Sequence, residues 1–197
     1  MTKENPQQYA TMSTDVLKAM SHPIRRHILT TLGQSGPARA ADLAERLGEP
    51  ANRLSFHLRT LASAGLIEEA PELARDKRDR VWKTVGGART IGSPEAPMQD
   101  RQLGMAVMAG IMQDHQDLLA RVAAYAPKYS TGEDPTIRGT LTDYTLRLSR
   151  PRFEELLQRI NEVVDEFRED ARKAKEAGTE TDLLGWNILL AAASEEI

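Results

Sequence analysis

The chain has 197 residues, of which 40% are hydrophobic and 28% are charged, and it contains no cysteine. These values are typical of a globular protein with one or two modest cores, and the lack of cysteine excludes disulfides and thiolate metal sites. No apolar run reaches the roughly 18 residues of a membrane-spanning helix, and residues 1–13 lack the apolar stretch of a secretory signal. We therefore expect a cytoplasmic address and no contact with a membrane.

Charge is distributed unevenly along the chain. The formal net charge is −3, but residues 1–90 carry +4 and residues 91–197 carry −7. A basic N-terminal half beside an acidic C-terminal half favours contact of the first half alone with phosphate. The positive charge of residues 1–90 is small, so it supports contact with phosphate only if the basic residues cluster on the elements that would meet it.

Helices are predicted through the first seventy residues, after a flexible stretch over residues 1–13. One helix begins at Pro23, a residue that suits the first helical position, and its apolar residues recur at helical spacing as far as residue 32. A short helix over 40–47 ends at Gly48, and the next, over 51–64, ends at Gly65. Two helices joined by a short turn that contains glycine predict a helix-turn-helix unit.

Two short strands are predicted next, over residues 66–69 and 80–85. The polar residues 70–79 between them suit a hairpin loop, or wing. Residues 86–98 contain three glycines and two prolines and are predicted to be a linker. The first domain is therefore expected over residues 14–86 and the linker over 87–100.

The second half is predicted to combine helices with strands. A long helix is expected over residues 102–125, and alternating apolar residues predict strands over 142–148 and 184–190. Between these strands the most regular amphipathic pattern of the chain predicts a helix, with Ser149 as its N-cap and Pro151 in its first turn. The predicted fold class is α+β, mostly α: a winged helix-turn-helix domain, then a dimerisation helix and a strand-helix-strand module over residues 101–197.

The stretch Leu43–Leu66, LAERLGEPANRLSFHLRTLASAGL, resembles the recognition segment of the ArsR-type winged helix-turn-helix regulators. Upstream, residues 17–20, His22-Pro23 and residues 25–29 resemble the opening helix pair of that family. The resemblance covers about residues 14–86. It implies a transcriptional regulator, by default a repressor, that binds double-stranded DNA at a palindromic operator as a homodimer and has no enzymatic activity.

The predicted recognition helix over 51–64 turns its leucines inward and its polar residues outward. Near the start of such a helix, side chains reach base edges: Asn52 suits adenine, Ser55 several bases, and Phe56 a thymine methyl. The arginines suit phosphate, and His57 is expected to pack or bond near the DNA backbone. The predicted DNA-binding residues are Asn52, Arg53, Ser55, Phe56, His57 and Arg59 in the helix and Arg75, Lys77, Arg78 and Arg80 in the wing.

Both groups of basic residues have a plainer interpretation. The helix arginines could form a solvated face, and Asp76 and Asp79 could neutralise the wing locally. Within the resemblance, contact with phosphate and with a narrow minor groove is the interpretation we favour.

The helix over 102–125 is the predicted dimer interface. Its glycines and alanines make part of its surface thin, which allows close approach, and its apolar residues supply burial. The predicted interface residues are Leu103, Val107, Met108, Ile111, Leu118 and Val122.

No metal, cofactor or catalytic site is predicted. ArsR-type metal sites use cysteine pairs, or Asp, His and Glu residues on the dimer helix. The chain has no cysteine, and His115 is the one histidine of its predicted dimer helix. A site built from His115 of both chains is the alternative. No nucleophile or acid pair accompanies His57. Tyr144, Trp186 and the methionines are candidates to line a pocket for a small organic effector, and core packing is the alternative.

Two other function classes remain open at this stage. A winged helix can serve as a protein–protein interaction module, with the acidic C-terminal half binding a partner. An enzyme with a fused winged helix is the second alternative, although residues 100–197 offer no polar cluster suited to catalysis.

Overall fold

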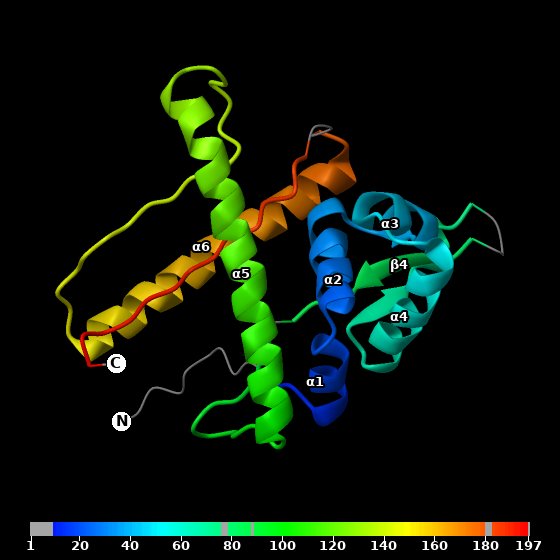
Figure 1. The fold of residues 1–197 in the computed structure, drawn as a ribbon, viewed down its shortest axis with the longest axis horizontal. Coiled ribbons are helices and arrows are strands. Elements are labelled where there is room, and N and C mark those ends of the chain that lie inside the picture. Colours follow the sequence, from blue (N-terminus) through cyan, green and yellow to red (C-terminus); the bar gives the residue numbers. More distant parts are fainter. Residues whose placement is uncertain (1–9, 76–78, 88, 180–182, 197) are drawn as a thin grey trace. The chain divides into compact units, whose positions relative to one another are not determined.

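The computed structural model describes residues 10–75, 79–87, 89–179 and 183–196. It confirms the predicted α+β class, with mostly helical secondary structure (Figure 1). The helices are α1 (Thr14–Met20), α2 (Pro23–Ser35), α3 (Ala40–Leu47), α4 (Ala51–Ser63), α5 (Arg101–Ser130) and α6 (Arg150–Ala177). The strands are β1 (Ala10–Thr11), β2 (Ala38–Arg39), β3 (Ile67–Glu69), β4 (Val81–Thr84) and β5 (Arg89–Thr90), and Pro71–Leu73 form one 3-10 turn.

The chain divides into two compact units. The first comprises residues up to Arg121 together with those from Gly185 onward, and the second comprises residues 122–184. The helices α1–α4 and all the strands belong to the first unit, and α6 belongs to the second. The long helix α5 begins in the first unit and ends in the second.

The first unit contains a winged helix-turn-helix. Strand β4 lies between β2 and β3 in an antiparallel sheet, with Trp82 opposite both Ala38 and Glu69. The two predicted wing strands are confirmed as β3 and β4. Strand β2 was not predicted, because two residues are too short to show an alternating pattern. A separate parallel pair joins β1, in the stretch predicted to be flexible, to β5, in the stretch predicted to be a linker.

The helix boundaries follow from local chemistry. Pro23 occupies the first turn of α2, and the Ser13 hydroxyl accepts a hydrogen bond from the Val16 amide at the start of α1. Gly48 and Gly65 end α3 and α4 with φ angles of +65° and +66°, a left-handed conformation that glycine adopts without a Cβ clash. The predicted ends of both helices are therefore confirmed.

One hydrophobic core holds these elements together. Its fully buried side chains come from every helix of the winged domain and from β3, and Trp82 of β4 is almost as deeply buried. The largest of them are Leu17, Ile28, Leu32, Leu43, Leu54, Leu58, Leu61 and Ile67. Burial of a leucine contributes roughly 1.5–3 kcal/mol, so α4 is fixed to the core by three such contacts.

Helix α5 is longer than the sequence predicts. The helix was expected to end near residue 125 and a loop to begin at Pro127, but the helix continues through this proline to Ser130. The Thr131 amide donates a hydrogen bond to the Pro127 carbonyl at 3.0 Å, so the last turn closes after the proline.

The strands predicted over residues 142–148 and 184–190 are absent, which corrects the strand-helix-strand prediction. Both segments lack strand pairing in the described part of the chain, while the predicted helix between them is confirmed as α6. Alternation predicts a strand only if one face is buried. Here the apolar side chains of both segments are exposed, Tyr144 to 79% and Ile188 to 77%.

Candidate nucleic-acid interface

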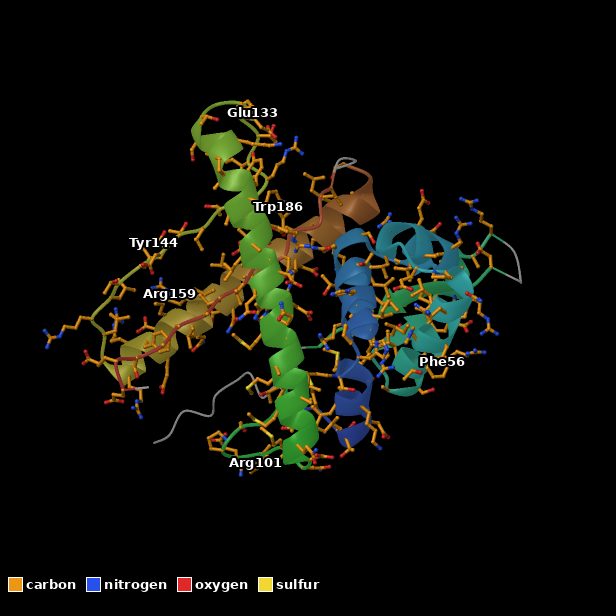
Figure 2. All side chains as sticks on the ribbon, viewed as in Figure 1. Phe56, Arg101, Glu133, Tyr144, Arg159 and Trp186 are labelled. Atoms are coloured by element: carbon orange, nitrogen blue, oxygen red, sulfur yellow. The ribbon has the colours of Figure 1, made fainter. Side chains whose placement is uncertain are left out.

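Helix α4 presents two different faces. Leu54, Leu58 and Leu61 recur at helical spacing and are buried against the core. Phe56 is 60% exposed and lies on the outer surface of the helix (Figure 2). The exposed residues of α4 that the sequence predicts as DNA contacts are Asn52, Arg53, Ser55, Phe56 and Arg59.

Local hydrogen bonds hold part of this exposed face. The Asn52 side-chain oxygen accepts from the Arg53 amide at 2.8 Å, and the Arg53 guanidinium pairs with Glu49 at 3.0 Å. The Ser55 hydroxyl donates to the Ala51 carbonyl at 3.1 Å. Arg59 has no ion pair within the residues that the structure describes, which leaves its five donors available to a ligand.

His57 is not part of the exposed face, which corrects its assignment to the DNA contacts. The residue is 6% exposed, its ring lies 4.6 Å from that of His22 between centroids, and its Nδ1 is buried without a hydrogen-bond partner in the described structure. Burial lowers the pKa of His57, and the charges of His22, Arg25 and Arg53 lower it further, against a smaller opposing effect of Glu49. A neutral, packed imidazole is the state that this environment favours.

The wing follows α4 and is partly described. Arg75 and Arg80 are exposed; the Arg75 amide donates to the Asp79 carboxylate at 3.3 Å, and the Arg80 guanidinium lies 3.4 Å from Glu69. Lys77 and Arg78, also predicted to contact DNA, lie outside the described residues.

A pocket of about 470 Å³ lies between the start of α3, the middle of α4 and the base of the wing. Three arginines line it, Arg39, Arg59 and Arg80, together with Asp79. The sequence did not single out Arg39, and it gave Asp79 only a neutralising part in the wing, because only the tertiary structure brings these two residues to Arg59. A basic residue just before a predicted helix was the one signal available.

Helix α5 also has two faces in the first unit. The side toward the winged domain includes Val107, which is 0% exposed, and Asp114, which pairs with the buried Arg26 at 2.6 Å. Met105, Met108, Met112 and Leu119 recur at helical spacing on the opposite side and are all exposed.

This arrangement changes the predicted dimer interface. Val107 belongs to the core of its own chain, and Leu103, Ile111, Leu118 and Val122 are partly buried. Of the six residues predicted, Met108 alone lies on the exposed stripe formed by Met105, Met108, Met112 and Leu119, which we call the methionine stripe.

Tyr144 and Trp186 belong to different units, and both are exposed (Figure 2). Among the residues that the structure describes, no group of three or more His, Asp or Glu side chains is arranged to hold a metal ion. Within the same residues, no helix is long and apolar enough to cross a membrane.

Comparisons with known proteins address the winged domain. Residues 20–70 match a family model described as a helix-turn-helix domain. A comparison with curated proteins finds no match.

Several solved structures are similar to part of this chain. HlyU from Vibrio cholerae is 25% identical over 36% of this chain and 73% of its own, with a TM-score of 0.32. A possible transcriptional regulator for arsenical resistance is 26% identical over 57% of this chain and 96% of its own (TM-score 0.31), and ZitR from Lactococcus lactis is 14% identical over 77% and 83% (TM-score 0.33).

The match to the helix-turn-helix family model agrees with the order of the elements. The order helix, helix, strand, helix, helix and two-stranded wing is that of a winged helix-turn-helix, and the motifs between Leu43 and Leu66 fall on α3, the turn and α4. Residues 20–70 are therefore similar to the helix-turn-helix domain family, and the elements around them complete a winged helix-turn-helix.

Proposed function

We propose that this protein is a DNA-binding transcriptional regulator that represses by occupying a palindromic operator as a homodimer. The observation that carries the proposal is the exposed face of α4. Three buried leucines fix this helix to the core, so Asn52, Ser55 and Phe56 point outward near its N-terminal end. In a helix-turn-helix domain, these are the positions that reach base edges in the major groove.

Each exposed residue of α4 has a role that its chemistry suits. Asn52 can pair with adenine once its side-chain oxygen releases the Arg53 amide, and Ser55 can donate to or accept from several bases. Phe56 offers an apolar contact to a thymine methyl. Arg53 and Arg59 suit phosphate, which positions the helix without reading sequence.

The wing would extend the contact to the neighbouring minor groove. Arg75 and Arg80 are exposed in its described part, and Lys77 and Arg78 add positive charge in sequence. Arginine is favoured in a narrow minor groove because the negative potential is enhanced there.

The methionine stripe would bind a second copy of this chain. Four exposed apolar side chains lie on one side of α5, whereas the other side is anchored to the winged domain by Arg26. A two-fold axis along this surface presents two recognition helices, which matches the two half-sites of a palindrome.

Operator selection tests the proposal directly. Genomic fragments bound by the full chain would be sequenced, and titrations on the selected and a scrambled duplex would follow. We expect Asn52→Ala and Ser55→Ala to relax sequence preference, at about 1–3 kcal/mol for a good base contact. Arg59→Ala should weaken binding to both duplexes alike and make the slope of log K against log salt less steep.

The salt dependence separates this function from the interaction-module alternative. Phosphate contacts release counterions, so DNA affinity should fall steeply as salt rises, whereas an apolar protein interface would change little. If the wild type and all variants bound both duplexes with equal affinity, the protein would not be a sequence-specific regulator.

A further inference from the structure

The pocket beside α4 is built from three elements that are distant in sequence. One side is lined by Arg39, the last residue of β2, and by Ala40 and Ala41 at the start of α3, and α4 supplies Ser55, Leu58 and Arg59. The base of the wing closes it with Asp79, Arg80 and Trp82. Its position places it along the border between the helix that would enter the major groove and the hairpin that would lie beside it.

Arg39 is held in place before any ligand arrives. Its Nε donates to Asp42 Oδ2 at 2.9 Å and its Nη2 to Asp42 Oδ1 at 2.7 Å, a bidentate pair. The hydrogen bond from Arg39 holds the pKa of Asp42 at about 2, so the pair stays charged at neutral pH. The Nη1 of Arg39 has no hydrogen bond in the described structure and remains available as a donor.

Three guanidinium groups and one carboxylate line the pocket. Arg39 and Arg80 also pair with Asp42 and Glu69, which do not line it, whereas Arg59 has no ion pair in the described structure. Asp79 lies 4.0 Å from Arg39 and opposes the positive charge. Ala40 and Ala41 lie in the first turn of α3, whose amides lack intrahelical acceptors and favour an anion. Ser55 lines the pocket on the α4 side, with its hydroxyl proton donated to the Ala51 carbonyl.

We propose that this pocket binds a phosphate group of the DNA backbone, between the major-groove helix and the wing, with Arg39 as a phosphate contact and Asp79 as an opposing charge. The proposal rests on the DNA-binding function above and adds a defined position to it. A planar guanidinium suits bidentate recognition of phosphate oxygens. One phosphate gripped from both α3 and α4 would fix the register of the recognition helix on the duplex.

The test uses two opposite charge changes in the full chain and one matched control. Arg39→Gln should weaken binding to selected and scrambled duplexes alike, several-fold, and lower the slope of log K against log salt by about one. Asp79→Asn should strengthen both and steepen the slope, and its amide oxygen can still accept from the Arg75 amide. Arg46→Gln removes an exposed arginine of α3 that does not line the pocket and should change neither affinity nor slope.

Since Arg39 also caps α3 through Asp42, unfolding curves of Arg39→Gln would accompany the titrations, and Asp79→Asn tests the pocket without touching that cap. If the wild type binds DNA and both Arg39→Gln and Asp79→Asn keep its affinity and salt slope, the phosphate site is overturned and the proposed function stands. If Arg46→Gln had the same effect as Arg39→Gln, the pocket would have no special part and the inference would fail.

A second arm separates DNA from free phosphate as the source of the ligand. In a Trp186→Phe background, Trp82 of the pocket is the remaining tryptophan. Inorganic phosphate would be titrated against chloride at equal ionic strength. Suppose that the wild type binds no DNA. A change in Trp82 fluorescence on adding phosphate, lost in Arg39→Gln, would then support free phosphate as the ligand of the pocket. No fluorescence change would overturn the phosphate site together with the proposed function.

Discussion

His57 and Phe56 are neighbours in sequence, yet one side chain is buried and the other exposed. Their rings are 5.6 Å apart between centroids, and the His57 ring also packs against His22 from the turn before α2. A histidine is apolar enough to pack and polar enough to contact DNA. Its position beside three core leucines on α4 therefore left both interpretations open until the packing was known.

The buried His57 predicts a pH-dependent stability. Because its pKa in the folded state is lower than the ordinary value of 6.5, the unfolded chain takes up the proton first as pH falls. The free energy of unfolding should be highest above about pH 6.5 and should decrease as pH falls through the lower folded-state pKa. Urea unfolding midpoints between pH 8 and pH 5 would measure this change.

Substitution identifies the source of that pH dependence. His57→Gln should flatten the profile, because it removes an imidazole whose pKa is lowered by burial in the folded chain. A His57→Gln profile that remains as steep as that of the wild type would assign the effect to another group.

Arg26 joins two elements, α2 and α5. Its Nε donates to Asp114 Oδ2 at 2.6 Å, its Nη2 donates to Gly110 O and Asp114 Oδ1, each at 3.2 Å, and its Nη1 donates to Met20 O at 3.0 Å. A buried guanidinium is costly unless its donors are paired, so these bonds fix α5 against the winged domain. The glycine at 110 permits this approach, since a Cβ there would lie 2.6 Å from the Arg26 Cζ.

We expect Gly110→Ala to destabilise the first unit by roughly 2 kcal/mol, because the methyl group displaces a buried guanidinium from its partners. Gly33→Ala, within α2, is a matched control: its Cβ would meet nothing within 4 Å. Alanine is a better helix former than glycine, so this control should stabilise by roughly 0.5–1 kcal/mol. Chemical denaturation should show a lower free energy of unfolding for Gly110→Ala and a higher one for Gly33→Ala. Equal shifts in the same direction would contradict the role of Arg26.

At the scale of the whole molecule, the two faces of α5 decide how copies of the chain would meet. The face that includes Val107 is used within the chain, and the methionine stripe is left exposed. Apolar surface of this kind on one side of a helix favours association with another apolar surface.

The double substitution Met108→Glu and Met112→Glu should therefore give a monomer at micromolar concentration. Charges placed in an apolar interface without partners are costly, while both residues are exposed in the single chain and can be replaced without loss of its core. Sedimentation would measure the mass, and binding to a two-half-site duplex should fall to that of one half-site. Gln102→Glu, off the stripe on the same helix, should remain dimeric; a wild type that sediments as a monomer would exclude this interface.

The winged domain is predicted well from the sequence because its signals are local. Pro23 begins a helix, Gly48 and Gly65 end helices, and leucines at helical spacing mark the buried side of α4. Each signal acts within one or two turns, so it needs no knowledge of distant residues. The exposed face of α4 follows as the complement of its buried face, and this is why the base-contact candidates were identifiable.

The tertiary structure alone decided the rest, because burial depends on what lies opposite a residue. The alternating residues around Tyr144 and Ile188 carry a strand pattern, but in the described part of the chain they pair with no strand, and both side chains are exposed. The apolar pattern of α5 does not tell which face packs within the chain, and the pairing of Arg26 with Asp114, 88 positions apart, decides this. The same holds for the basic pocket, where Arg39, Arg59 and Arg80 meet only after the chain has folded.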